Sequence, residues 1–79
     1  MSNVELLRKT FAESLGVEEE IVHENLRYNT IQEWDSVAHM VLVTAIEGRF
    51  DIMLDTDDIL GMSTFGKAVE ILRKYDVEV

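Results

Sequence analysis

The 79-residue sequence contains no cysteine and no proline. Without cysteine, the chain has no disulfide framework, no thiolate metal site and no cysteine nucleophile, which suits a reducing cytosol. No apolar run approaches the roughly 18 residues that a membrane span needs, and the first residues lack the basic and then apolar order of a signal peptide. We therefore expect a cytoplasmic protein that does not span a membrane.

Basic residues are scarce, since 7 Lys and Arg face 16 Asp and Glu and the net charge is −9. Nucleic acid backbones and anionic lipids are bound mainly by Lys and Arg, so the charge predicts neither a nucleic acid nor a membrane partner. An acidic surface instead favours basic protein surfaces. The length allows one domain over residues 1–79, and an apolar content of 47% is enough for its core.

Four segments combine an N-cap residue with an apolar pattern of helical period. They are Val4–Leu15, Asp35–Arg49, Asp57–Leu60 and a last helix that begins at Ser63 or Thr64. The β-branched residues of the second segment would also suit a strand, but its length and its cap favour a helix. Its expected core-facing residues are Val37, Met40, Val41, Ile46 and Phe50.

Residues 17–34 show no sustained period and are predicted to form a long ordered loop. Ile21, Leu26, Ile31 and Trp34 are spaced like anchors that hold such a loop on a core. The predicted fold is therefore all-α, a small four-helix bundle with a long first loop and a short third helix.

The candidate catalytic and metal-binding residues of the sequence do not have the spacing that the known motifs require. A calcium loop that starts at Asp51 lacks the required glycine and the final glutamate. His23 and His39 are far apart without a ligand motif, so each is expected to be solvated or to face a partner. Asp35, Ser36 and His39 have the residue types of a hydrolase triad, but they share one helical turn without a nucleophile elbow. We expect neither an enzyme nor a metal site.

Ser36 is predicted in the first turn of the second helix, where unpaired N–H groups and the positive end of the helix dipole favour a phosphate ester. The alternative is a serine that only helps to cap the helix, and Trp34-Asp35-Ser36-Val37 alone favour this alternative.

The longer stretch from Glu33 to Ile52 resembles the acyl carrier proteins, whose signature is Asp-Ser-Leu followed by an apolar helix that ends in Glu-x-x-Phe. The resemblance extends over the whole chain, with Val37 a mild departure from leucine. The matching positions are Asp35, Ser36, Val37, Leu42, Ala45, Glu47, Phe50 and Asp51.

This resemblance implies a carrier function. Ser36 would receive 4′-phosphopantetheine from coenzyme A through a phosphopantetheinyl transferase, and Asp35 is the acid of the motif. The thiol of the arm would hold an acyl or aminoacyl group as a thioester, loaded by an activating ligase and delivered to acyltransferases or synthases. The protein itself would catalyse nothing, and we expect a monomer.

The resemblance also implies docking and cargo sites. Glu47 and Asp51 match the acidic partner-docking helix, with Val37 and Met40 as an apolar centre. The expected lining of an acyl pocket is Leu42, Ile46, Leu54, Ile59, Met62 and Ala68, although ordinary core positions explain most of them as well.

Ala38 and Val41 stand where fatty-acid carriers have acids, so we expect a specialised pathway for polyketide, aminoacyl or surface-polysaccharide synthesis rather than housekeeping fatty-acid synthesis. An unmodified carrier-like module that binds a partner through its acidic face is the alternative.

Overall fold

The computed structural model describes residues 2–79, and within them the chain forms four α-helices and one short 3₁₀ helix. The elements are α1 (Asn3–Leu15), η1 (Glu19–Ile21), α2 (Ser36–Phe50), α3 (Thr56–Gly61) and α4 (Phe65–Lys74). Across this range the one β-type pairing is an isolated bridge between Arg27 and Thr64. The prediction of a small all-α fold with a long first loop and a short third helix is confirmed.

Each α-helix begins after a polar residue whose side chain accepts a hydrogen bond from the backbone N–H three residues further on. Such a cap satisfies a donor that has no partner inside the helix. The four N-caps are Ser2, Asp35, Asp55 and Thr64. At the other end of α1, Gly16 adopts a left-handed conformation with φ of 70°, which favours glycine. These local features place the helix boundaries close to the predicted ones.

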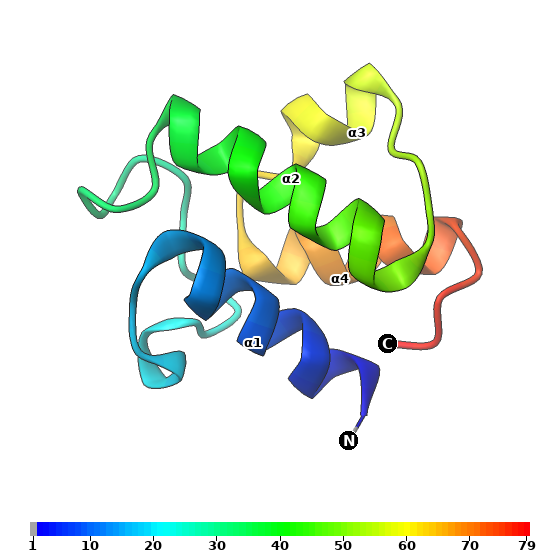
Figure 1. Cartoon of the computed structure of the whole chain (residues 1–79), viewed down its shortest axis with the longest axis horizontal. Helices are drawn as coiled ribbons and strands as arrows, with labels where there is room; N and C mark the ends of the chain where they lie inside the picture. The colour runs from blue at the N-terminus through cyan, green and yellow to red at the C-terminus, as the bar shows by residue number, and fades with distance from the viewer. Residues whose placement is uncertain (1) are drawn as a thin grey trace.

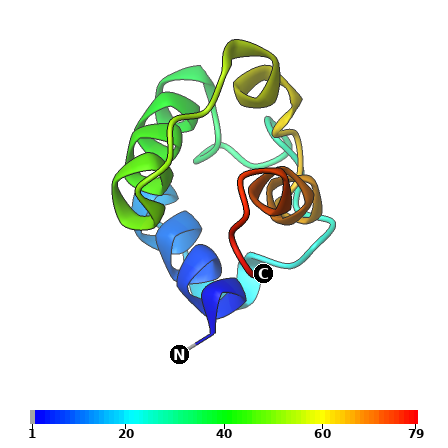
Figure 2. The same ribbon diagram turned by 90° about the vertical axis from the view of Figure 1, so that its right-hand side faces the viewer.

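The four helices surround one core. Helices α1 and α2 lie side by side and run in opposite directions, with α4 behind them and α3 beside α2 (Figure 1). Viewed along the helices, the chain forms a ring of α1, α2, α3 and α4 (Figure 2). Within residues 2–79, no helix combines the length and the apolar character required to cross a bilayer.

Three aromatic rings meet at the centre of the core. The ring of Phe11 in α1 lies edge-on to Trp34, at 5.5 Å between centroids, and edge-on to Phe65 in α4, at 5.1 Å. Edge-to-face contacts of this kind add to the stabilisation from apolar burial. All three side chains are buried, and the end of the loop is packed against α1 through Trp34.

One face of α2 was predicted incorrectly. Val37, Met40 and Val41 were expected to face the core, but they are exposed by 74%, 53% and 51%. The buried residues of this helix are instead Leu42, Val43 and Ile46. Apolar residues surround most of α2, so the sequence does not indicate a single buried stripe, and packing against α1 selects the face that is covered.

The long loop is held by its side chains and by its backbone. Leu26 and Trp34 are buried as predicted, and Ile31 is half-buried. The prediction for Ile21 was wrong, because Ile21 ends η1 with its side chain exposed and the next residue, Val22, enters the core. The 3₁₀ turn of η1 shifts the core-facing position by one residue relative to the predicted spacing.

Backbone hydrogen bonds join this loop to the connection between α3 and α4. The N–H of Tyr28 donates to the carbonyl of Ser63 at 2.8 Å, and the N–H of Phe65 donates to the carbonyl of Leu26 at 3.2 Å. Gly66 comes so close that an added Cβ would lie 3.2 Å from the carbonyl oxygen of Glu24. The loop therefore has a defined place beside α4 and beside the start of α2.

Candidate functional site

Ser36 is the first residue of α2, and its side chain is exposed. Asp35 precedes it as the N-cap, with Oδ1 accepting the N–H of Ala38 at 2.9 Å. The carbonyl of Asp35 accepts the N–H of His39 at 2.8 Å. The N–H groups of Ser36 and Val37 precede the first intrahelical donor, and they remain at the positive end of the helix.

The hydroxyl of Ser36 lies 3.0 Å from the phenol oxygen of Tyr28, within hydrogen-bond distance. Tyr28 belongs to the long loop, and its ring packs edge-on against Trp34 and His39, at 6.1 and 5.3 Å between centroids. A loop residue distant from the motif therefore reaches the first turn of α2.

His39 links three segments. The indole N–H of Trp34 donates to Nδ1 of His39 at 3.0 Å, and Nε2 of His39 lies 2.8 Å from the carbonyl oxygen of Ile59 in α3. Because an indole nitrogen can only donate, Nδ1 is the acceptor and the proton lies on Nε2, which donates to the carbonyl. The expectation of a solvated or partner-facing His39 was wrong, since this half-buried ring connects α2 with α3 and the loop.

A cavity of about 300 Å³ opens beside Ser36, between the loop, α2 and α3. Its lining comprises Tyr28, Ser36, His39, Met40, Ile59, Leu60, Met62 and Ser63. Of the six residues expected to line an acyl pocket, Ile59 and Met62 are here. The other four are buried elsewhere in the core: Leu42, Ile46, Leu54 and Ala68.

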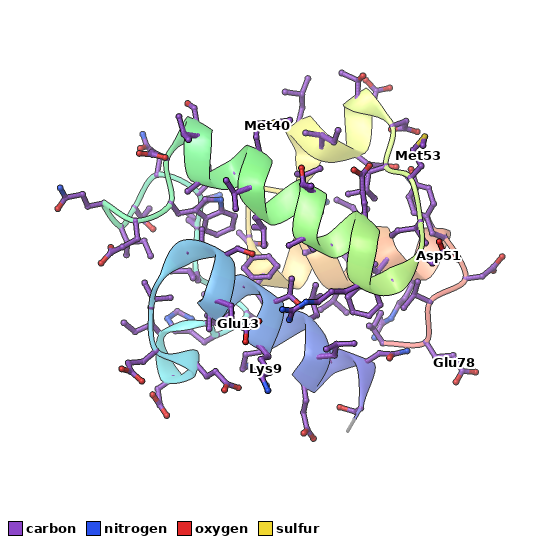
Figure 3. All side chains as sticks on the ribbon, viewed as in Figure 1. Lys9, Glu13, Met40, Asp51, Met53 and Glu78 are labelled. Atoms are coloured by element: carbon purple, nitrogen blue, oxygen red, sulfur yellow. The ribbon has the colours of Figure 1, made fainter. Side chains whose placement is uncertain are left out.

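A shallow apolar groove runs along the outer face of α2 on the other side of Ser36. Its residues are Ser36, Val37, Met40, Val41, Thr44 and Ala45, and we call it the α2 groove. None of these residues carries a charge. Met40 borders both the cavity and the α2 groove, and Figure 3 shows it on the side of α2 that faces α3.

The two acids expected to dock partners lie at the far end of α2. Asp51 is the C-cap in a left-handed conformation with φ of 53°, and Figure 3 shows it at the end of the helix opposite Met40. Oε2 of Glu47 accepts the N–H of Leu54 at 2.9 Å. The structure thus places Val37 and Met40 beside Ser36, whereas Glu47 and Asp51 lie about three turns or more from Ser36 along the helix.

Arg49 is the one basic residue of α2, and its guanidinium pairs with the carboxylate of Glu13 in α1. It also donates to the hydroxyl of Thr10 at 3.2 Å. Both contacts direct the cation toward α1 and away from the α2 groove. The α2 groove therefore has neither an acid nor a base among its own residues.

A buried carboxylate fastens α3 to the end of α4. Asp58 is 5% exposed and accepts hydrogen bonds from Nζ of Lys74 and from the hydroxyl of Tyr75, each at 2.6 Å. These contacts, led by the Lys74 bond, lower the pKa of the Asp58 carboxyl below its ordinary value of 3.8 and outweigh the desolvation that would raise it. The same hydrogen bonds raise the pKa of Lys74 and of Tyr75.

Over residues 2–79, no three His, Cys, Asp or Glu side chains are grouped so that they could hold a metal ion. His23 is exposed in the loop, and His39 is engaged at both ring nitrogens.

The sequence analysis missed Tyr28 as a residue of the site, and it did not predict the bridging contacts of His39. No local pattern marks either one, because Tyr28 reaches Ser36 only through the path of the loop and His39 depends on α3 for its second contact.

A comparison with known families supplies independent information on the region. Residues 5–72 match the family described as phosphopantetheine attachment site.

Proposed function

Because this chain belongs to the phosphopantetheine attachment family, whose domains are non-catalytic carriers with a covalently attached 4′-phosphopantetheine, we propose that Ser36 is the attachment residue. When bound, the arm supplies a terminal thiol that holds an acyl or aminoacyl group as a thioester. The protein's own part is to present Ser36 and to bind the enzymes that load and unload the arm.

The observation that carries the assignment is the position of the Ser36 hydroxyl. It is exposed at the first turn of a 15-residue helix, next to two backbone N–H groups that precede the first intrahelical donor. A phosphodiester on this oxygen would lie at the positive end of α2, where a negative charge is stabilised. Asp35 stays engaged with Ala38 and holds the turn in place. Ser36 and the first turn of α2 therefore fit a covalently attached phosphopantetheine group.

The α2 groove and the end of α2 are proposed as the docking surface for the transferase, the activating ligase and the acyltransferases or synthases. An enzyme that acts at Ser36 must cover the residues around it, and these include the exposed Val37 and Met40. Glu47 and Asp51 would add charge at the distant end of the same helix. Docking would then combine apolar contact near Ser36 with an acidic edge further away.

We also propose a specialised pathway and a cytoplasmic location. The outer face of α2 near Ser36 is apolar and uncharged, so it suits partner enzymes with apolar docking surfaces rather than strongly basic ones. This supports polyketide, aminoacyl or surface-polysaccharide synthesis over housekeeping fatty-acid synthesis. Ile59 and Met62 in the cavity are proposed as the residues that an apolar cargo would contact.

Intact mass spectrometry tests the attachment. The chain is incubated with coenzyme A and a promiscuous phosphopantetheinyl transferase, alongside Ser36→Ala and Ser63→Ala. Ser63 is a suitable control because it is another exposed serine of the same cavity. We expect the wild-type chain and Ser63→Ala to gain the mass of one arm and Ser36→Ala to gain none. An unmodified wild-type chain would support the alternative of a carrier-like interaction module.

A further inference from the structure

Tyr28 points its phenol hydroxyl at the very oxygen that the proposed function assigns to the arm, 3.0 Å away. Resting on that proposed function, we propose that Tyr28 is a positioning residue. Its hydroxyl holds the phosphate group on Ser36 at the α3 side of α2, so that the arm leaves Ser36 toward the cavity and not along the α2 groove.

The phenol group is held in place before any modification. The backbone N–H of Tyr28 donates to the carbonyl of Ser63, and its ring packs edge-on against Trp34 and His39. Trp34 is fully buried, and His39 is fixed by hydrogen bonds at both nitrogens. Two anchored rings therefore support the tyrosine, and little side-chain entropy remains to be lost when its hydroxyl binds an anion.

A phosphodiester is a better acceptor for this hydroxyl than the serine is. Its oxygens carry a negative charge, and hydrogen bonds to an ionised acceptor are shorter and roughly twice as strong as those between neutral groups. Tyrosine donates one O–H, which the neighbouring hydroxyl of Ser36 shares in the unmodified chain. Modification thus replaces a bond between two hydroxyls with a charge-assisted one from the same donor.

Ser36 borders two hollows, and Tyr28 belongs to only one of them. The cavity contains the hydroxyls of Tyr28 and Ser63, while the α2 groove contains the hydroxyl of Thr44. Thr44 already donates to the carbonyl of Met40 at 3.0 Å. The tyrosine hydroxyl is therefore the donor that lies next to Ser36 on the cavity side and not on the groove side. A hydrogen bond from it to the phosphate group directs the arm into the cavity.

The test compares backbone amide chemical shifts of the isotope-labelled full chain before and after modification of Ser36. In the wild-type chain we expect the largest changes beyond the first turn of α2 at Ile59, Leu60 and Ser63. In Tyr28→Phe, which keeps the ring but lacks the hydroxyl, these changes should fall at least twofold, while those at Val41, Thr44 and Ala45 should grow. Ser63→Ala removes a different hydroxyl from the same cavity and should keep the wild-type changes at Ile59 and Leu60.

Phosphorus NMR gives a second measurement on the same samples. The ³¹P resonance should move in Tyr28→Phe and stay in place in Ser63→Ala, while all three chains keep the same melting curve. Identical amide patterns and identical ³¹P shifts in wild-type and Tyr28→Phe chains, each modified at Ser36, would overturn the role of Tyr28 and leave the proposed function standing. Failure to modify Ser36 in the wild-type chain would overturn both.

Discussion

Trp34 and His39 share a hydrogen bond of 3.0 Å in which the indole donates and the imidazole accepts. This bond determines the tautomer of His39, and the tautomer in turn allows Nε2 to donate to the carbonyl of Ile59. The core tryptophan is thereby connected through one ring to α3, beside the cavity. The position of the short third helix thus depends on a side chain of the second helix.

Replacement of His39 by Phe should destabilise the fold, because the indole N–H and the carbonyl of Ile59 each lose their partner. An unsatisfied buried polar group costs about 1–3 kcal/mol, and we expect a decrease of that size in the free energy of unfolding. Urea unfolding followed by circular dichroism measures it. His23→Phe serves as the control, since His23 is exposed in the loop. Equal stability of the two variants would contradict a structural role for His39.

Acid should unfold the protein through Asp58. Its pKa is lower in the folded protein than in the unfolded chain, so the stabilisation is present above the ordinary value of 3.8 and is lost as the pH falls through the lower folded value. We expect the melting temperature to drop below about pH 4 in the wild-type chain and to depend less on pH in Asp58→Asn. The exposed neighbour Asp57 provides the control Asp57→Asn, which should keep the wild-type acid slope.

Asp35 and Ser36 should differ sharply in their effect on stability. Asp35→Ala removes the N-cap of α2 and should lower the free energy of unfolding by about 0.5–2 kcal/mol. Ser36→Ala removes only an exposed bond to Tyr28 and leaves the cap intact, so its loss should be smaller. Thermal unfolding of both variants measures the difference. A larger loss in Ser36→Ala would mean that the serine, and not Asp35, holds the start of α2.

Partner docking should depend on apolar contact near Ser36 more than on charge. Met40→Ser should slow transfer of the arm by a transferase at every salt concentration, because Met40 lies in the α2 groove. The double change Glu47→Gln with Asp51→Asn removes two charges, yet it keeps an acceptor for Leu54 and a residue that tolerates the left-handed conformation.

For this double variant we expect a decrease in the transfer rate of about tenfold at low salt that disappears as salt rises, since charge acts mainly on the rate of encounter. Steady-state rates over a series of salt concentrations measure both effects. If the double variant is slow at high salt as well, Glu47 and Asp51 contribute more than long-range attraction.

Salt should stabilise the protein. Five acids are crowded at the end of α2, in α3 and in the connection between them, and of these only Asp58 has an ion-pair partner within the described residues. They are Glu47, Asp51, Asp55, Asp57 and Asp58. Screening of their repulsion, in a chain of net charge −9, should raise the melting temperature between low and roughly physiological ionic strength. A melting temperature that stays constant or drops would contradict this.

The helices could be predicted from the sequence because their ends are encoded locally. Asp35 and Thr64 each cap a helix through a backbone N–H three residues away, and Gly16 ends α1 by its own conformation. Neither effect needs a tertiary partner. The same locality predicted that Ser36 lies in a first turn, because this position depends on Asp35. The role of Ser36 came instead from the resemblance of the longer stretch from Glu33 to Ile52.

The buried face of α2 and the surroundings of Ser36 could not be predicted in the same way. Val41 and Leu42 are neighbours of similar chemistry, and only packing decides that the first is exposed and the second buried. Tyr28 and His39 acquire their roles from contacts that the loop and α3 supply. Spacing along a helix contains no information on such partners.

The pairing of the loop with the start of α4 also sets an order of events during synthesis. Tyr28 is held by Ser63, and Leu26 by Phe65, residues far downstream that leave the ribosome late. Contacts between distant parts of a chain require closure of the intervening segment before they can form. A nascent chain that ends before Phe65 thus displays the motif serine without its finished surroundings. The fold thereby delays completion of the surroundings of Ser36 until synthesis has passed Phe65.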